Sequence, residues 1–319
     1  MFKDKIVLNE LERICSQLQV SESDIFFRNK RYSVTNENKL VSLVNILYSE
    51  CYALKENYQN GAMHIQNANF NFEETFVAEL SLNNTTQEKI TNGWKINKNF
   101  QNGYFEVTKN NKNRIIHSSD IRHPHNYSSD DKMISIFQPK EDKYRQPTFY
   151  YVFSNETIAL DDQITRIYWN IGSKGASKLI QIITQKLNYY HIPFLFKCLN
   201  NPNLYFRRDP AVLYVEDKNL QMLSLLLPDL SATMENYLEE DVPLFTFKYS
   251  KGIGIAQSPS SKESFGMSRM GILAESLLDL TNKNADTTKT IKHISVEFLK
   301  KGINPEAPFL NKGSKILIN

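Results

Sequence analysis

The spacing of hydrophobic residues predicts helices in the first third of the chain. Over residues 5–19, 36–58 and 71–92, apolar side chains recur at intervals of three and four, which is the pattern of an amphipathic helix. The strongest of these patterns covers residues 36–58, where leucine and valine side chains form one stripe. We therefore predict a helical N-terminal region over residues 1–92.

Beyond residue 92 the pattern changes to short strands that alternate with helices. The predicted strands cover residues 93–108, 113–117, 133–137, 149–153, 165–171, 192–199, 211–216 and 243–258. The predicted helices cover residues 177–190, 217–227, 229–239, 268–282 and 286–301. The fold class is therefore α+β, with a mixed sheet of antiparallel type and flanking helices over residues 93–319.

One predicted strand has two very different faces. The segment TRIYWNI, which begins at Thr165, carries isoleucine and tryptophan side chains on one face. Its other face carries Arg166, Tyr168 and Asn170. We expect the apolar face to pack against the helix at residues 177–190, and the polar face to form the floor of an anion-binding site.

Composition excludes several classes of protein. A net charge of +3 is too small to indicate nucleic acid binding, and the basic residues occur only in small clusters. No stretch of 18 uncharged apolar residues is present, and the N-terminus lacks the apolar core of a signal peptide. Three widely spaced cysteines, Cys15, Cys51 and Cys198, indicate a reducing compartment. We expect a cytoplasmic protein that does not enter a membrane.

The common cofactor and hydrolase motifs are absent from the sequence. It contains no GxGxxG, Walker, HExxH or GxSxG pattern. His123 and His125 are spaced closely enough to hold a metal, but no second pair of ligands is near them in the sequence. We therefore interpret them as part of a polar loop and expect no metal and no organic cofactor.

The candidate chemistry is a set of cations on or beside the predicted strands. Its members are Arg166, Lys197, Arg207, Arg208 and Arg269. An arginine presents a planar fork that suits phosphate, and positive charge near a lysine lowers the pKa of its amine. Such a set predicts an anion site that contains a neutral lysine able to act as a base.

A structural alternative pairs each cation with an acid, for example Arg208 with Asp209 and Arg269 with Glu263. In that case the cations form ordinary surface ion pairs of an α+β protein. This alternative predicts that Lys197 and Arg269 lie far apart in the fold.

Several segments resemble the HopA-type family, namely RIYWNI, FRRDPAVLYV, PLFTFKYSKGIGIAQSP, SFGMSR and the N-terminal LYSECY. The resemblance covers nearly the whole chain. The family includes a plant-pathogen type III effector and relatives encoded beside peptide-modification genes. Those relatives are understood as lyases that work with a separate kinase-like protein to make lanthionine-type peptides. The resemblance therefore implies a phosphorylated precursor peptide and a kinase-like protein as partners.

The order of the cations is also similar to that of phosphothreonine lyase effectors. By this similarity Lys197 is the base, Arg208 and Arg269 bind phosphate, and Arg207 is an alternative to Arg208. Arg166 belongs to the same phosphate-binding set, and the fold is expected to be phosphothreonine-lyase-like. Asn170 and Asp209 are expected to support the site.

The sequence departs from that pattern at the general acid. Phosphothreonine lyases carry a histidine on the first strand, where this chain has Arg166, Tyr168 and Asn170. Tyr168 can protonate the leaving phosphate, His123 or His125 can reach in from the loop, or the arginines alone can stabilise the dianion. The implied activity is a phosphoserine or phosphothreonine lyase. The alternative is an effector-like or inactive relative that binds phosphopeptides or protein partners without catalysis.

Overall fold

The N-terminal part of the chain combines helices with a small sheet. The computed structural model describes residues 1–55, 72–100, 103–122, 133–159, 163–259, 264–280 and 285–314. Its first elements are α1 (Lys5–Gln17), β1 (Leu18–Val20), β2 (Asp24–Phe27), β3 (Lys30–Ser33), α2 (Lys39–Leu47) and the π-helix η1 (Tyr48–Ala53). The helices at residues 5–17 and 39–53 agree with the predicted pattern, but the helical description of residues 1–92 is not confirmed as a whole.

The missed sheet contains a tight hairpin between β2 and β3. Its turn residues Arg28 and Asn29 have φ values of 49° and 61°, which is the left-handed region that asparagine tolerates. Asn29 was the local signal for this turn. Farther along the chain, α4 (Glu74–Asn83) ends earlier than predicted, and the chain is extended again from Lys89.

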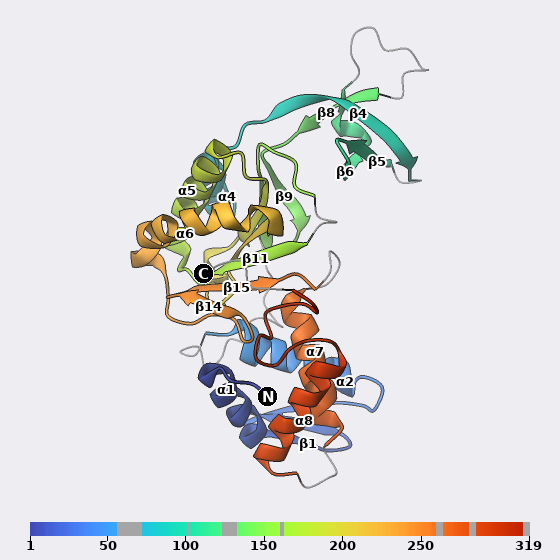
Figure 1. Ribbon diagram of the computed structural model, residues 1–319, viewed down its shortest axis with the longest axis vertical. Coiled ribbons are helices and arrows are strands. Elements are labelled where there is room, and N and C mark those ends of the chain that lie inside the picture. Colours follow the sequence, from blue (N-terminus) through green and yellow to red (C-terminus); the bar gives the residue numbers. More distant parts are fainter. Residues whose placement is uncertain are drawn as a thin grey trace.

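A five-stranded antiparallel sheet follows, with the order β6-β5-β4-β8-β7. Its strands are β4 (Lys89–Asn99), β5 (Tyr104–Lys109), β6 (Lys112–His117), β7 (Ile121–Arg122) and β8 (Met133–Gln138). It projects from the end of the molecule opposite the N-terminal part (Figure 1). A small core of its own, centred on Trp94, Val107 and Ile134, holds it together.

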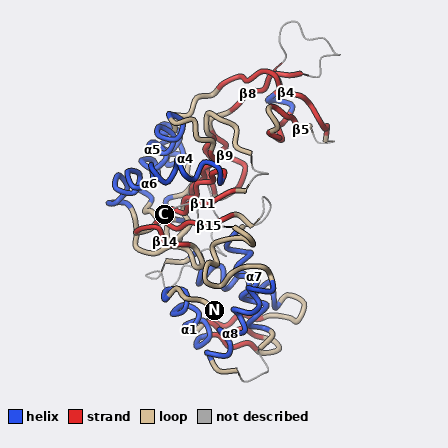
Figure 2. The backbone as a smooth tube through the Cα atoms, viewed as in Figure 1, coloured by secondary structure: helices blue, strands red, loops and turns tan. Residues whose placement is uncertain are grey.

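The central element is a seven-stranded antiparallel sheet with the order β14-β15-β11-β13-β12-β10-β9. The strands are β9 (Glu141–Gln146), β10 (Phe149–Phe153), β11 (Ile164–Trp169), β12 (Phe194–Leu199), β13 (Ala211–Glu216), β14 (Phe247–Ser250) and β15 (Ile253–Gln257). Helices α5 (Ala176–Tyr189) and α6 (Leu220–Met234) lie beside it (Figure 2). The α+β fold class is confirmed.

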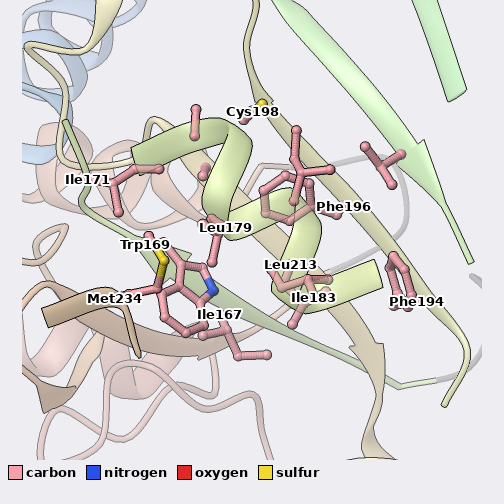
Figure 3. Packing of buried hydrophobic residues seen from close by; sticks show 14 of the residues in the cluster. Ile167, Trp169, Ile171, Leu179, Ile183, Phe194, Phe196, Cys198, Leu213 and Met234 are labelled. Atoms are coloured by element: carbon pink, nitrogen blue, oxygen red, sulfur yellow. The ribbon is translucent and has the colours of Figure 1, made fainter. Parts of the chain in front are cut away.

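The apolar face of β11 packs as its alternation predicted. Ile167 and Trp169 are fully buried in one cluster with Leu179 and Ile183 of α5 (Figure 3). Burial of such side chains stabilises a fold by about 1.5–3 kcal/mol each, so this face is a major contributor to the core.

The opposite face of the sheet meets the N-terminal part and the last two helices. These are α7 (Phe265–Leu278) and α8 (Thr287–Lys300), which pack on each other and against α2 and α1 respectively. Ser264 caps α7, and its Oγ accepts a hydrogen bond from the backbone N–H of Met267 at 3.4 Å. No helix among the described residues has the length and hydrophobicity needed to span a bilayer.

Candidate functional site

A cavity of about 880 Å³ opens over the polar face of the seven-stranded sheet. Its walls come from the central strands, the π-helix η1, the start of α7 and the C-terminal segment around Asn311. Its charged lining residues are Arg145, Arg166, Lys197, Asp209, Asp217 and Lys312. Because apolar and polar groups share this lining, the cavity is suited to an anionic ligand with some hydrophobic surface.

Cross-strand register sets the spacing of the central residues. Tyr168 on β11 pairs with Val212 on β13, and Val212 pairs with Lys197 on β12. Two strand spacings therefore separate Tyr168 from Lys197, which is about 10 Å between their backbones. Arg166 lies on the same face two residues before Tyr168. The alternation of β11 thus brings Arg166 and Tyr168 into one cavity with Lys197.

Lys197 projects into this cavity over aromatic rings. Its Nζ lies 4.0 Å from the ring centroid of Phe149 and 5.8 Å from that of Tyr151. Burial lowers the pKa of Lys197 to about 8, Asp209 opposes this, and Arg166, Arg207 and Arg145 lower it further. The sequence had suggested the arginines as the reason for a lowered pKa, whereas desolvation is the larger cause. An appreciable fraction of this amine is therefore neutral at physiological pH.

Arg166 and Tyr168 are both buried at the base of the cavity. The Arg166 Nε donates to Ser258 Oγ at 2.7 Å, and its Cζ lies 5.4 Å from the ring centroid of Tyr214. Burial raises the pKa of Tyr168, while the charge of Arg166 and a hydrogen bond with Tyr52 act in the opposite direction. A tyrosine in this setting keeps its proton at neutral pH and can donate it.

The π-helix η1 supplies two tyrosines that the site predictions omitted. Tyr48 and Tyr52 stack with ring centroids 5.2 Å apart, and both line the cavity. Short π-helical turns occur frequently at functional sites. The segment LYSECY had entered the sequence analysis only as part of a resemblance, since nothing in its spacing indicates that it reaches a distant strand.

Arg207 and Asp209 form a supporting ion pair. The Arg207 Nε and Nη2 donate to the two carboxylate oxygens of Asp209 at 2.8 Å and 2.9 Å. Arg207 Nη2 also donates to the Tyr48 hydroxyl at 3.0 Å. Asp209 lines the cavity, whereas Arg207 stands behind it. The structural alternative had assumed that Asp209 pairs with Arg208. In the structure Asp209 pairs with Arg207 instead.

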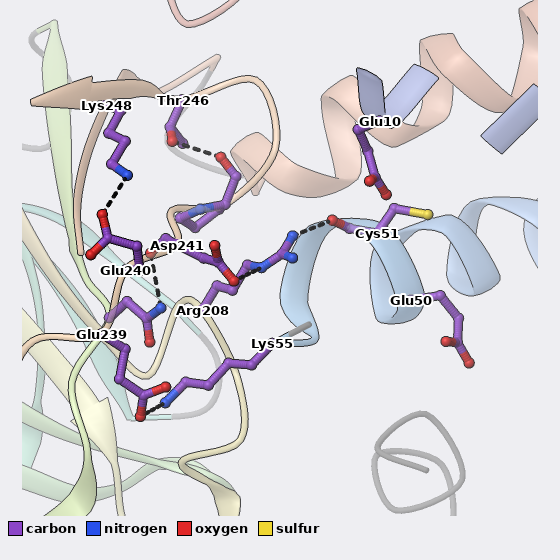
Figure 4. A network of polar contacts seen from close by, with 12 residues as sticks. Glu10, Glu50, Cys51, Lys55, Arg208, Glu239, Glu240, Asp241, Thr246 and Lys248 are labelled. Carbon is purple, nitrogen blue, oxygen red and sulfur yellow. Dashed lines mark hydrogen bonds and ion pairs between the residues drawn. The ribbon is translucent and has the colours of Figure 1, made fainter. Parts of the chain in front are cut away.

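Arg208 lies outside the cavity, contrary to the expectation that it contacts the phosphate. Its Nη1 donates to the backbone carbonyl of Cys51 at 3.0 Å, and its Nε lies 3.7 Å from the Asp241 carboxylate (Figure 4). Beside it, Lys55 forms an ion pair of 2.6 Å with Glu239. The carbonyls at the end of a helix lack partners within the helix, so a cation is favourable there. Arg208 thus anchors η1 to the body of the protein.

Arg269 is also placed away from the cavity. Its side chain is 1% exposed, and its Nε and Nη2 donate to the carbonyls of Pro308 and Leu310 at 2.8 Å and 3.1 Å. These bonds hold the C-terminal segment whose residues Asn311 and Lys312 form one wall of the cavity. Arg269 therefore shapes the site without lining it.

Asn170, a predicted supporting residue, is not part of the cavity lining. The Asn170 side chain donates to the carbonyl of Asp241 at 2.8 Å, at the end of β11. His123 and His125 lie outside the described residues. Within the described ranges, one group of possible metal ligands, Asp279, His293 and Glu297, occurs at the α7–α8 pair and not at the cavity.

Comparison with known proteins gives one family match. The model of the HopA1 effector protein family matches residues 141–310. A solved effector protein structure from Pseudomonas syringae pv. tomato strain DC3000 is 15% identical, with a TM-score of 0.47, covering 86% of this chain and 97% of that one. A second, from Pseudomonas syringae pv. syringae strain 61, is 14% identical with a TM-score of 0.49, covering 98% and 100%. No curated protein matches the chain.

Proposed function

The chain belongs to the HopA1 effector protein family, and we propose that it is a carbon–oxygen lyase acting on phosphoserine or phosphothreonine in a peptide. The observation that carries this proposal is Lys197, an amine with a pKa of about 8 in a cavity that also holds Arg166 and Tyr168. An amine whose pKa is lowered toward neutrality, in one cavity with a fixed positive charge, suits proton abstraction next to a phosphate ester.

Lys197 is the base of the proposed reaction. Its neutral Nζ removes the proton from Cα of the phosphorylated residue, and the electron pair of the Cα–H bond forms the Cα=Cβ double bond. The Cβ–O bond breaks, and its electrons leave with the phosphate. The products are a dehydroalanine or dehydrobutyrine residue, free phosphate and a protonated lysine.

Arg166 and Tyr168 act on the leaving group. The guanidinium of Arg166 balances the charge that develops on the phosphate oxygens, and the Tyr168 hydroxyl donates a proton to the departing oxygen. The lysine later returns the proton to the tyrosine through solvent. In this scheme Arg207, Arg208 and Arg269 support the cavity, which revises the phosphate-binding set inferred from resemblance. No metal or organic cofactor takes part.

The proposed substrate is a precursor peptide that a separate kinase-like protein phosphorylates in the cytoplasm. Dehydroalanine and dehydrobutyrine are electrophiles that a cysteine thiol can attack, so the product suits lanthionine-type peptide modification. The volume of the cavity, about 880 Å³, is sufficient for several residues of an extended chain.

Mass spectrometry of a phosphothreonine peptide incubated with the purified protein tests the activity. We expect a mass loss equal to one phosphoric acid with the native chain, and none with Lys197→Ala. Lys251→Ala, which removes a more exposed lysine from the turn between β14 and β15, is the matched control and keeps full activity.

Two other results contradict the proposal in different ways. Full elimination by Lys197→Ala removes the assigned base. Tight phosphopeptide binding without any elimination, using a peptide that carries its native leader, indicates instead an effector-like binding protein without turnover.

A further inference from the structure

Two arginines from different sheets lie over neighbouring aromatic rings of β10. Arg145 belongs to β9 of the seven-stranded sheet, and Arg114 belongs to β6 of the projecting five-stranded sheet. The Arg145 Cζ lies 5.3 Å from the ring centroid of Tyr151, and the Arg114 Cζ lies 6.0 Å from that of Phe153.

The two aromatic rings fix the spacing of the arginines. Tyr151 and Phe153 alternate along β10, so their side chains project from the same face, about 7 Å apart along the strand. A guanidinium held over an aromatic ring loses little of its ability to donate at its edges. The pair therefore presents two sets of N–H donors toward one region.

Among the described residues, neither arginine has an acidic partner within ion-pair distance. The nearby Asp142 carboxylate instead accepts hydrogen bonds from the backbone N–H groups of Tyr144 and Arg145, at 3.0 Å and 2.9 Å. Burial lowers the pKa of Arg114, Asp120 opposes this from a distance, and Arg145 lowers it further. The two cations thus repel each other, and an anion between them would relieve that repulsion.

The arginine pair is close to the proposed base. Tyr151, which Arg145 covers, is the cross-strand neighbour of Lys197. Arg145 and Gln146 line the cavity, and Arg145 is one of the charges that lower the pKa of Lys197. Arg166 lies on β11, on the other side of Lys197. The cavity therefore has a cation on each side of the lysine.

We propose that Arg114 and Arg145 form a second anion subsite, which binds a negatively charged side chain of the peptide near the phosphorylated residue. The ligand chemistry is a carboxylate of Asp or Glu, or a second phosphate. Because Arg145 is two strands from Lys197 and an extended peptide advances about 3.3 Å per residue, the second anion lies roughly one to three residues from the phosphorylated one. Only the placement of the reacting residue at Lys197 rests on the proposed function.

Binding of labelled phosphopeptides to the Lys197→Ala protein tests the subsite without turnover. The probes carry one phosphoserine and, at each position from three residues before it to three after it, Gln, Glu or a second phosphoserine. At one or more positions we expect Glu or phosphoserine to bind about tenfold more tightly than Gln at low salt. The ratio between the Glu and phosphoserine probes tells which anion the subsite prefers.

Three substitutions in that background locate the effect. Arg114→Gln and Arg145→Gln are each expected to remove most of the advantage of the acidic probe. Arg122→Gln, which removes an exposed arginine from the same projecting sheet, is the control and retains it. Arg145→Glu is expected to reverse the preference toward a probe that carries Lys, and this exposed residue forms no ion pair with any described residue that the substitution would break.

The outcomes separate the subsite from the lyase activity. Equal affinity for Gln and Glu probes at every position, or an equal loss with Arg122→Gln, overturns the subsite even if the native chain eliminates phosphate. A preference that Arg145→Glu reverses supports the subsite even if no peptide loses phosphate. Thermal melting of each variant verifies that the protein is folded. If Arg114→Gln does not fold, the probe preference of Arg145→Glu tests the subsite on its own.

Discussion

The two faces of the seven-stranded sheet differ in what covers them. On one face Ile167 and Trp169 are fully buried against α5. On the other face Arg166 and Tyr168 are buried and Lys197 is partly buried, and all three line a cavity of about 880 Å³. Burial of the apolar face stabilises the fold. On the polar face, burial of charged and polar side chains costs free energy of desolvation.

This difference shows where the fold accepts a thermodynamic cost. Burying an amine disfavours its charged form, and here burial lowers the pKa of Lys197 to about 8 although Asp209 opposes the shift. A lysine in this environment contributes little to core packing, so its position is better explained by a role in the cavity. The comparison therefore predicts that substitutions on the two faces have opposite signatures.

The largest expected effect is on the proposed elimination at the polar face. Lys197→Ala should lower the elimination rate by about 10²–10⁴-fold, as for loss of a general base, with little change in thermal stability. Single-turnover kinetics with a phosphothreonine peptide measures the rate, and calorimetry measures the stability. A large loss of stability without loss of rate would place Lys197 with the structural residues.

The apolar face should respond in the reverse manner. Trp169→Ala creates a cavity in the core and should lower the free energy of unfolding by about 3–5 kcal/mol. Its neighbour Tyr168→Phe removes one hydroxyl and should cost less than about 1.5 kcal/mol, while reducing the elimination rate. Denaturant titration of both variants compares adjacent residues of one strand, and equal destabilisation contradicts the assignment of the faces.

Two arginines extend the comparison with a smaller effect. Arg269→Gln breaks the bonds to the carbonyls of Pro308 and Leu310 and should destabilise the protein by about 1.5–3 kcal/mol. Arg166→Gln should instead weaken phosphopeptide binding, because it removes a cation from the cavity floor. Thermal melting and peptide affinity, measured for both variants, separate the structural role of Arg269 from the phosphate-binding role of Arg166. If Arg269→Gln keeps full stability but binds the peptide more weakly, this assignment is wrong.

The smallest expected effect is on the pH dependence. A base must be neutral, so the elimination rate should rise with pH and level off above the Lys197 pKa of about 8. Arg166 lowers that pKa. Removal of its charge in Arg166→Gln should therefore shift the rising part of the pH–rate profile to higher pH, by less than about one pH unit. Rates measured from pH 6 to about 10 test the direction of this shift, and a shift to lower pH contradicts the prediction.

Alternation within single strands was readable from the sequence. It gave β11 its two faces and placed Arg166 and Tyr168 on the same one, because the side-chain period of a strand is a local property. Helix spacing likewise predicted α5 and α8 to within one residue at each end, whereas α7 begins three residues and ends four residues earlier than predicted. The edge strand β9 was missed, since its sequence EDKYRQ is polar on both faces and has no apolar alternation. Arg145 lies on this strand and was therefore not among the predicted site residues.

The sequence alone thus determined the fold class, the polar strand and the position of Lys197 on its own strand. Only the tertiary structure decided which cations share the cavity. Arg207 and Arg208 are adjacent in the chain, yet one meets Asp209 and the other the carbonyl of Cys51. Arg269 binds carbonyls of a segment 39 residues away in the sequence. The direction of a long, flexible cation depends on which distant acids and unpaired carbonyls surround it, and local spacing carries no information about those partners.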